Sequence, residues 1–250
     1  MTLMTVERLT KRYGGLHAVA DVSFRVDPGQ IVGLIGDNGA GKTTLFNLLS
    51  GFVAPTSGQI DFRGRDITGW SPERRARQGL VRTFQRSRVF PEVSVEENVR
   101  MGCFLQQRRR FRDRFRIPHG ERGAGPDASP EGRVAELLEL AGLWDFRKAL
   151  AGHLSFGYQR RLAIAIALGA QPELLLLDEP FAGLSPESSA EMDALIQTLR
   201  ARGVTLLLIE HRMASIVTAC DRLLVMQNGR LIIPRPTSES GSEEVVHAVG

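Results

Sequence analysis

Alternating and apolar stretches divide this chain into segments that predict strands. Residues 18–26 alternate apolar with polar side chains, which predicts a half-buried strand, and residues 3–12 predict another. Four leucines at 174–177 predict a strand buried on both faces, as in a parallel sheet. Further strands are expected at residues 31–35, 59–62, 204–209 and 222–226, the last ending at a hairpin turn formed by Asn228 and Gly229.

Helical periodicity alternates with these strands. Helices are expected at residues 42–49, 158–169, 186–200 and 212–220. A short helix should begin after Ser71, whose side chain can cap it, with Pro72 at the first helical position. In the middle of the chain, helices at 95–105 and 133–140 flank an Arg-dense stretch and a Gly- and Pro-rich loop at 117–131. We therefore expect an α/β core that is interrupted by a helical block.

Length and composition fit a globular protein. The chain has 250 residues, of which 42% are apolar and 24% charged. No apolar run approaches the ~20 residues that span a bilayer, and the N-terminus lacks the basic start and long apolar stretch of a secretory signal. We therefore expect a cytoplasmic protein, which a partner could hold at a membrane. Cys103 and Cys220 have neither disulfide nor metal-site spacing and are expected to be reduced thiols.

Arginine supplies nearly all of the positive charge. The net charge is +4, and lysine occurs only at Lys11, Lys42 and Lys148. Binding of phosphate or nucleic acid could explain this bias, but genomic composition explains it too and is the interpretation we favour. The scarcity singles out Lys42, because a compact ammonium group can reach phosphate oxygens.

Two motifs far apart in the chain indicate its chemistry. The first is a glycine-rich turn between a predicted strand and a predicted helix, and it fits the P-loop pattern. It consists of Gly36, Asp37, Asn38, Gly39, Ala40, Gly41, Lys42, Thr43 and Thr44. Its backbone N–H groups can surround a phosphate chain, and the helix N-terminus that follows favours negative charge. The second motif is the leucine strand, which ends in Asp178 and Glu179, two carboxylates suited to holding Mg²⁺ and polarising a water.

Further fragments surround these two motifs. Tyr13 follows the first strand, Gln85 precedes the helical block, and His211 follows the strand at 204–209. The segment Leu154-Ser155-Phe156-Gly157-Tyr158-Gln159 precedes the helix before the acidic strand. The order P-loop, glutamine, Leu-Ser-x-Gly-x-Gln, Asp-Glu and histidine resembles that of the nucleotide-binding subunits of ABC transporters. The resemblance covers residues from about 3 to 232.

Within that family, the chain is similar to the ATPases of bacterial branched-chain amino-acid importers. The segments that carry this likeness are 12–16 (RYGGL), 81–85 (VRTFQ), 154–157 (LSFG), 179–186 (EPFAGLSP) and 209–213 (IEHRM). Importers of urea and short amides share much of the same pattern, so they remain an alternative.

The resemblance implies a P-loop NTPase core with an antiparallel β subdomain and an inserted α-helical subdomain. It implies one ABC ATPase domain at residues 3–232. The core would comprise residues 3–90 and 158–232, and the helical subdomain residues 91–157. Residues 233–250 would form a polar C-terminal tail, in which a short helix at 243–248 is possible.

ATP and Mg²⁺ are the ligands that the resemblance implies. Lys42 would contact the β- and γ-phosphates, and the P-loop backbone, including Gly39 and Gly41, would donate N–H groups. Thr43 and Asp178 would hold the metal, together with Gln85.

Four residues have an ordinary alternative beside their expected role. Glu179 is the candidate general base for the attacking water, or a solvated acid after a strand. Gln85 would sense metal and water, or is a surface polar residue. His211 would contact the γ-phosphate, or is a structural or surface residue. Tyr13 would stack on adenine, or is a core aromatic residue.

The signature segment implies a dimer. In the family, residues equivalent to Ser155, Gly157 and Gln159 belong to the motif that contacts nucleotide bound by the opposite subunit. The implied partners are this second ABC ATPase, identical or related, and integral-membrane permease subunits bound through the helical subdomain. A periplasmic or extracytoplasmic substrate-binding protein would act indirectly. The implied location is the cytoplasmic face of the inner membrane, where the chain would be peripheral.

The chain departs from the family pattern at several positions. Asp37 replaces a common proline and adds a negative charge near the phosphates. Phe156 and Tyr158 lie within the signature, and Ser185 stands where many members have aspartate. These departures bear on efficiency more than on function.

Two other functions compete with transport. A soluble ABC ATPase acting on nucleic acid or ribosomes could use the arginines at 108–116, which are interleaved with Phe111 and Phe115. The known soluble classes carry long coiled-coil insertions or two cassettes, however, and neither fits in 250 residues, so nucleic acid is not an expected partner. A regulator without turnover is disfavoured because the expected catalytic set is complete, with Lys42, Asp178, Glu179 and His211 all present.

Overall fold

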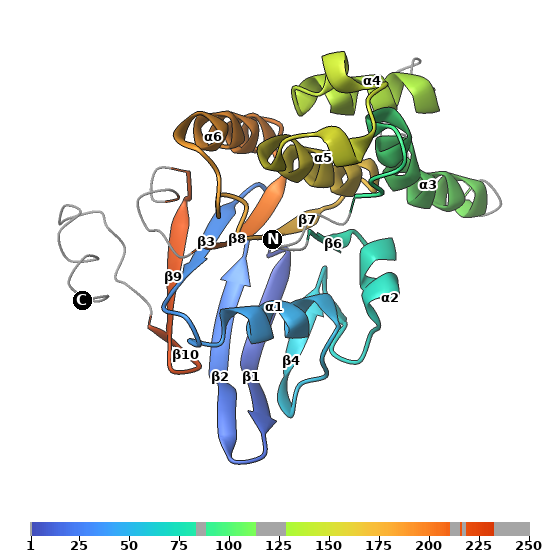
Figure 1. The fold of residues 1–250 in the computed structure, drawn as a ribbon. Coiled ribbons are helices and arrows are strands. Elements are labelled where there is room, and N and C mark those ends of the chain that lie inside the picture. The colour runs from blue at the N-terminus through green and yellow to red at the C-terminus, as the bar shows by residue number, and fades with distance from the viewer. Residues whose placement is uncertain (1, 84–88, 114–128, 211–215, 217–218, 233–250) are drawn as a thin grey trace.

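Two β-sheets form the fold, with one helix between them, a short helix beside them and the remaining helices above (Figure 1). The computed structural model describes residues 2–83, 89–113, 129–210, 216 and 219–232, without the side chains of 105–113. The following predictions lie wholly or mostly outside these residues: Gln85, His211, the loop at 117–131, the helix at 212–220 and the tail at 233–250.

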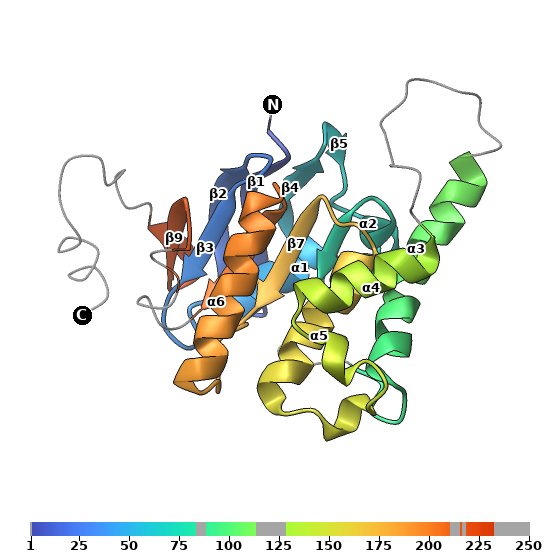
Figure 2. The same ribbon diagram turned by 90° about the horizontal axis from the view of Figure 1, so that it is seen from above.

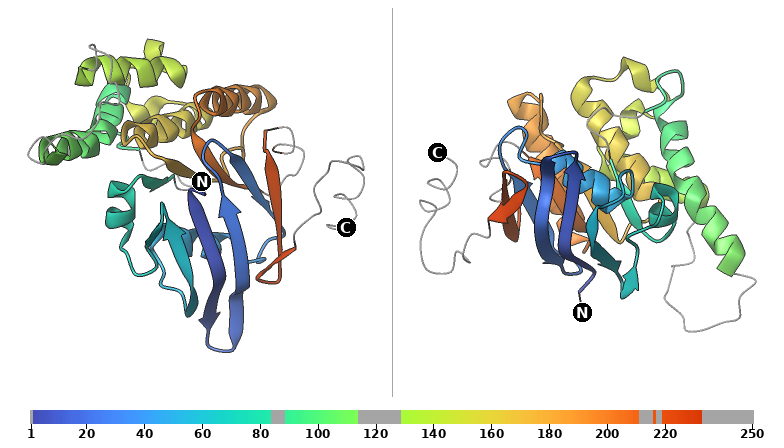
Figure 3. Two further views of the ribbon diagram at one scale, coloured as in Figure 1. Left: turned by 180° about the vertical axis from the view of Figure 1, so that it is seen from behind. Right: turned by 90° about the horizontal axis from the view of Figure 1, so that it is seen from below.

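The larger sheet contains six strands in the order β10-β9-β3-β8-β7-β6. All neighbouring pairs are parallel except β9 and β10, which form an antiparallel hairpin at one edge (Figure 3). The strands are β3 (Ile31–Ile35), β6 (Leu80–Arg82), β7 (Leu174–Asp178), β8 (Thr205–Glu210), β9 (Arg222–Gln227) and β10 (Arg230–Ile232). Parallel strands need crossover connections, and helices provide most of them here.

The smaller sheet is antiparallel and has the order β2-β1-β4-β5. Its strands are β1 (Met4–Tyr13), β2 (Leu16–Val26), β4 (Ser57–Phe62) and β5 (Arg65–Asp66). The predicted strand at 59–62 is confirmed as part of β4, which pairs with β5.

Helices connect the strands and cover both faces of the larger sheet. They are α1 (Lys42–Ser50), α2 (Pro72–Arg77), α3 (Val95–Asp113), α4 (Pro130–Leu140), α5 (Phe156–Gly169) and α6 (Pro186–Ala201). Two short 3₁₀ segments at Trp144–Phe146 and Ala151–His153 join α4 to α5. None of the described helices combines the length and the apolar character that a membrane span requires.

Successive residues of the parallel strands point into two different apolar clusters, because side chains alternate across a strand. In β7, Leu174 and Leu176 pack in the cluster that contains α1 and the smaller sheet. Leu175 and Leu177 pack in the cluster that contains α5 and α6. A strand covered on both faces needs an apolar residue at every position, which explains the run of four leucines.

The predicted helical block is confirmed as helices packed beside the sheet. Figure 2 shows α3 and α4 next to α5, to one side of α6. Val99 of α3, Leu137 and Leu138 of α4 and Leu162 of α5 are fully buried in the same apolar cluster as β7. The helical block therefore shares its core with the sheet through α5.

The elements differ most from the predictions in three places, whereas the other boundaries shift by at most two residues. Strand β6 was not predicted, because a three-residue segment is too short to show a pattern. Helix α3 continues to Asp113 through the Arg-dense stretch, since arginine is a good helix former. Helix α4 begins at Pro130 rather than 133, where Ser129 Oγ accepts a hydrogen bond of 3.0 Å from the backbone N–H of Gly132. The Ser-Pro pair at 129–130 is the same start signal that correctly predicted α2 at 71–72.

Arg75 holds the C-terminal end of α1. Its side chain is 1% exposed, and its guanidinium donates to the carbonyls of Leu48, Leu49, Thr68 and Trp70 at 2.6 to 3.1 Å. Helix C-termini carry unsatisfied carbonyls and a partial negative charge, so a cation is favourable there. Burial lowers the pKa of Arg75 to about 10, which still leaves it charged at neutral pH.

We expect Arg75→Met to lower the free energy of unfolding by about 3 kcal/mol, because the carbonyls of α1 would stay buried without their charged donor. Urea denaturation followed by circular dichroism measures this change. Arg74→Met is the matched control, since Arg74 is exposed and stacks on Trp70 at 3.8 Å from the ring centroid. A loss under 1 kcal/mol for Arg75→Met would contradict the capping role.

Candidate functional site

The sheet topology brings the sequence-predicted residues to one edge. Strands β3, β8, β7 and β6 are parallel neighbours, so their carboxyl ends meet at the same edge of the sheet. The P-loop follows β3, Asp178 ends β7 and Glu179 follows it. Ligands of open α/β sheets bind at this edge. The two motifs that the sequence separates by more than 130 positions therefore belong to one site.

The P-loop backbone adopts conformations that only glycine accommodates here. Gly36, Gly39 and Gly41 have φ values of 152°, 82° and 104°. A Cβ atom on Gly41 would lie 2.2 Å from the carbonyl oxygen of Ala18, and one on Gly36 would lie 2.1 Å from that of Met226. No side chain caps the N-terminus of α1, whose N-cap is Gly41. The first N–H groups of the helix are therefore available to a bound anion.

Lys42 is the first residue of α1, and its side chain is only 4% exposed. Its ammonium group donates to the carbonyl oxygen of Gly36 and, at 2.7 Å, to that of Asp37. Burial lowers the pKa of Lys42, while the nearby charges of Glu179 and Asp37 act in the opposite direction. The positive charge of Lys42 in the P-loop therefore interacts with the negative charge of Glu179 in the acidic motif.

Glu179 occupies a strained backbone position at the end of β7. Its φ of 50° lies in the left-handed region, which is costly for a residue with a side chain. Hydrogen bonds of its backbone hold it: its N–H donates to the carbonyl of Ile209 at 3.1 Å, and its own carbonyl accepts from the N–H of Ala182 at 3.2 Å and from the guanidinium of Arg160. The residue is 8% exposed, so it is not a freely solvated acid. Strain that neighbours enforce is typical of functional positions.

Asp178, the last residue of β7, is paired with Arg82 at the end of β6. The two side chains are 7% and 5% exposed, and Arg82 Nη2 lies 2.6 Å from Asp178 Oδ2. Sequence reasoning did not identify Arg82 as a site residue. The signal that could have found it is a charged residue ending a short apolar segment beside the glutamine motif.

Two further residues of the site were missed. Glu210 ends β8, is 2% exposed and accepts a 2.8 Å hydrogen bond from the backbone N–H of Phe181. This bond fixes the turn that follows Glu179. Arg160 of α5 is 7% exposed, and burial lowers its pKa while the charges of Glu210, Glu179 and Asp178 raise it. Arg160 is therefore the cation that faces the acidic motif from the helical side.

The oxygen donors of the site suit Mg²⁺. Thr43 offers a hydroxyl at the start of α1, and Asp178 offers a carboxylate oxygen. Mg²⁺ binds commonly through one or two protein oxygens plus substrate phosphates, rather than in an all-protein cage. The described part of the chain contains no group of three or more His, Cys, Asp or Glu side chains that could hold a metal.

The signature segment forms the N-terminus of α5. Ser155 is the N-cap and is exposed, and its Oγ accepts a 3.5 Å hydrogen bond from the N–H of Tyr158. A Cβ atom on Gly157 would lie 2.8 Å from Ser188 Oγ, so only glycine fits without displacing that side chain. Gln159 donates through Nε2 to the carbonyls of Ala151 and Leu154 at 3.3 and 3.2 Å. In this structure Gln159 therefore holds the loop that precedes the signature.

Tyr13 ends β1 and is 50% exposed, so it is not a core aromatic residue. The ammonium of Lys11 lies 5.1 Å from its ring centroid. The ring thus has an accessible face on which a planar base could stack.

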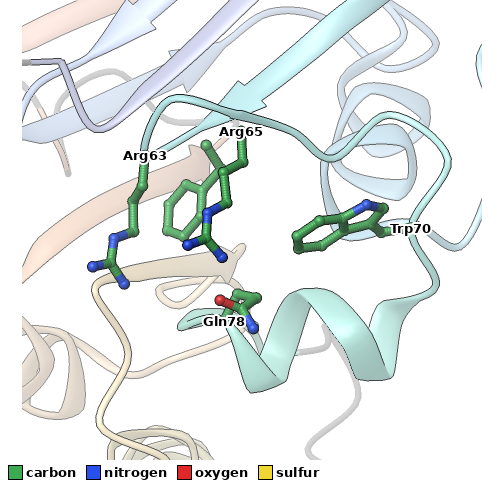
Figure 4. Close-up of a pocket in the computed structure, with 5 residues that line it drawn as sticks. Arg63, Arg65, Trp70 and Gln78 are labelled. Carbon is green, nitrogen blue, oxygen red and sulfur yellow. The ribbon is translucent and has the colours of Figure 1, made fainter.

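A pocket of about 110 Å³ lies elsewhere, between the β4–β5 hairpin and α2 (Figure 4). Its lining comprises Phe62, Arg63, Arg65, Trp70 and Gln78. None of the sequence-predicted site residues that the structure describes lines this pocket, and Arg63 already pairs with Glu173 at 2.5 Å.

Comparison with known proteins gives consistent results. Residues 19–182 match the ABC transporter family. The chain is 42% identical over 229 residues to the high-affinity branched-chain amino acid transport ATP-binding protein LivG of Escherichia coli K12 (91% of this chain, 89% of LivG). It is 40% identical over 230 residues to the corresponding protein BraF of Pseudomonas aeruginosa PAO1, with the same coverage. Among solved structures, it is similar to the ADP conformation of MJ1267, an ATP-binding cassette of an ABC transporter (TM-score 0.77, 32% identity, 93% of this chain and 90% of that chain).

Proposed function

The chain belongs to the ABC transporter family as one of its ATP-hydrolysing subunits, and we propose that it energises an importer of branched-chain amino acids. One observation carries the proposal: the P-loop and the strained, buried Glu179 meet at one sheet edge in a chain 42% identical to LivG. The substrate class is that named for LivG and BraF.

The P-loop residues bind the phosphates of ATP in this proposal. The N–H groups around Gly39 and Gly41 point at the phosphate chain, and Lys42 turns its ammonium from the loop carbonyls to the β- and γ-phosphate oxygens. Tyr13 stacks on the adenine ring. Thr43 and Asp178 would hold Mg²⁺, which would neutralise phosphate charge when bound.

Glu179 acts as the general base. Its carboxylate accepts a proton from the water that attacks the γ-phosphate, and Arg160 and Glu210 keep its backbone turn in place. Gln85 and His211, which lie outside the described residues, complete the proposed site. Their assigned roles are sensing of metal and water, and contact with the γ-phosphate.

A dimer with a second ABC ATPase, identical or related, would complete each site. Ser155 is exposed at the N-terminus of α5, where a hydroxyl and free N–H groups could meet a γ-phosphate held by the other subunit. Gly157 leaves room for Ser188 to pack beside this helix start, and Gln159 keeps the preceding loop in place. ATP would thus join the two subunits, and hydrolysis would release them.

Permease subunits would bind the helical subdomain at residues 91–157, at the cytoplasmic face of the membrane. The exposed apolar side chains of this region support that role, since large apolar groups at the surface mark interaction sites. They include Met101, Trp144, Phe146 and Leu150. The substrate-binding protein of the importer would act only through the permease.

Uptake by the native host tests the substrate class. We expect cells lacking this chain to lose most high-affinity uptake of radiolabelled leucine, isoleucine and valine. The wild-type chain should restore it, and the Glu179→Gln variant should not. Normal uptake of these amino acids, with loss of urea or short-amide uptake, would assign the chain to the alternative importer class.

We expect Asp37→Pro to preserve or tighten ATP binding. The Asp37 side chain is exposed, and the substitution removes a negative charge beside the phosphate site while its carbonyl can still accept from Lys42. Calorimetric titration with ATP measures the change. A large loss of affinity would show that the aspartate is needed for binding.

A further inference from the structure

A buried arginine connects the candidate metal-binding carboxylate to the P-loop helix. Arg82 Nη2 lies 2.6 Å from Asp178 Oδ2, and Arg82 Nη1 donates to Asn47 Oδ1 at 2.7 Å and to Ser50 Oγ at 3.1 Å. The guanidinium carbon is 5.5 Å from the ring centroid of Phe46. Asn47, Ser50 and Phe46 all belong to α1, so one planar group joins β7 to the helix that begins at the P-loop.

Burial makes the Arg82–Asp178 ion pair energetically costly. The Arg82 and Asp178 side chains are 5% and 7% exposed, and removing two charges from water costs more than a surface ion pair returns. Well-packed apolar residues of similar volume commonly serve stability as well as or better than a buried ion pair. Stability alone therefore does not explain an arginine at this position. Orientation of the Asp178 carboxylate explains it better.

The pair leaves one carboxylate oxygen available. Asp178 Oδ2 is taken by Arg82, and Asp178 Oδ1 makes no hydrogen bond to the part of the chain that the structure describes. A guanidinium presents its donors in a rigid fork, so it can hold two groups in a defined relative position, which a lysine ammonium cannot.

We propose that Arg82 is a positioning residue for the metal–nucleotide site: it holds Asp178 so that Oδ1 faces the Mg²⁺ of the nucleotide complex. Through Asn47 and Ser50, it also sets the position of that carboxylate relative to the P-loop helix. The inference rests on the proposed nucleotide-binding function and adds a residue to which no role was assigned. Removing a residue that hydrogen-bonds to a metal ligand and orients it typically weakens metal binding by about 10- to 100-fold.

The other buried arginine at this helix supplies a matched control. Arg75 holds the same end of α1, but its described hydrogen bonds go only to backbone carbonyls. Loss of Arg75 should therefore disturb the helix end without changing how Asp178 is held. A defect shared by both variants would come from α1, whereas a defect specific to Arg82 would come from the carboxylate.

The experiment measures metal binding directly. The full chain and its Arg82→Met, Arg82→Lys and Arg75→Met variants are titrated with Mn²⁺ in the presence of saturating ADP, followed by electron paramagnetic resonance. ADP affinity is measured separately in EDTA, and the thermal midpoint reports folding. We expect Arg82→Met to weaken Mn²⁺ binding by at least tenfold while ADP affinity in EDTA changes less than threefold.

The two other variants separate the positioning role from the effects of charge and of folding. Arg82→Lys retains the charge that Asp178 needs and should fold, yet it should still weaken Mn²⁺ binding about threefold or more because it lacks the fork. Arg75→Met should lower the thermal midpoint and leave Mn²⁺ affinity unchanged.

Three outcomes would overturn the inference or its premise. Wild-type Mn²⁺ affinity in Arg82→Lys overturns the positioning role, even if Arg82→Met fails to fold. An equal loss of Mn²⁺ affinity in Arg75→Met also overturns it, because the effect would then belong to the helix end. If the wild-type chain binds neither ADP nor Mn²⁺–ADP, the proposed function fails before Arg82 is tested.

Discussion

Replacing Glu179 with glutamine should reduce ATP hydrolysis by at least 100-fold and leave ATP affinity within about threefold of wild type. Glutamine keeps the shape of the side chain but cannot accept a proton, and a positioned general base contributes about 10²- to 10⁴-fold to a rate. The backbone at this position is held by Arg160 and Ile209 through main-chain atoms, so the strained turn should persist in the variant. Phosphate release and calorimetric titration measure the two quantities.

Glu187→Gln is the control for this substitution. Glu187 is an exposed acid in the first turn of α6, a few residues from Glu179 in the chain. Its neutralisation should leave both hydrolysis and binding unchanged. An unchanged hydrolysis rate in Glu179→Gln would show that the assignment of the base is wrong. A large loss of ATP binding would show instead that the carboxylate is part of the nucleotide pocket.

Replacing Lys42 with methionine should weaken ATP binding roughly 10- to 100-fold and reduce hydrolysis by at least 100-fold. A hydrogen bond to a charged group contributes about 1.5–3 kcal/mol, and the ammonium contributes both binding and stabilisation of the transferring phosphate. The side chain is 4% exposed and its pKa is lowered by burial, so an apolar chain of similar length should fit without unfolding the loop.

Lys148→Met gives the matching control for Lys42. Lys148 also pairs with a carboxylate, Glu96 at 2.8 Å, but it lies on the surface of the helical block and is 77% exposed. Its loss should change neither binding nor hydrolysis. Wild-type ATP affinity in Lys42→Met, with the thermal midpoint retained, would contradict the role of the P-loop in this chain.

Most helices and strands could be predicted from the sequence because residues within each element determine its conformation. The four leucines of β7 predicted a strand covered on both faces, and the structure places them alternately in two apolar clusters. Ser71 and Pro72 predicted the start of α2 correctly. Strand β6 could not be predicted in the same way, because its three residues become a strand only by pairing with β7.

The residues of the candidate site likewise fall into those that local sequence predicted and those that depend on the tertiary fold. The P-loop was predictable because its backbone conformation requires glycine at fixed positions. The spacing of these glycines is therefore visible in the sequence. Arg82, Arg160 and Glu210 were missed because their roles depend on which strands and helices become neighbours. In a chain rich in arginine, a single arginine carries only a weak local signal, such as the position of Arg82 at the end of a short apolar segment. Only the pairing of β6 with β7, and the packing of α5 on the sheet, reveal what these residues contact.

The central claim is that this ATPase serves a membrane permease, and isolation of the assembled complex tests it most directly. The chain is tagged in its native host, the membranes are solubilised gently, and the proteins that co-purify are identified by mass spectrometry. We predict a multi-span permease together with a second ABC ATPase subunit, which is either this chain again or a related one. Recovery of ribosomes or nucleic acid without any membrane protein would contradict the claim and favour a soluble ATPase.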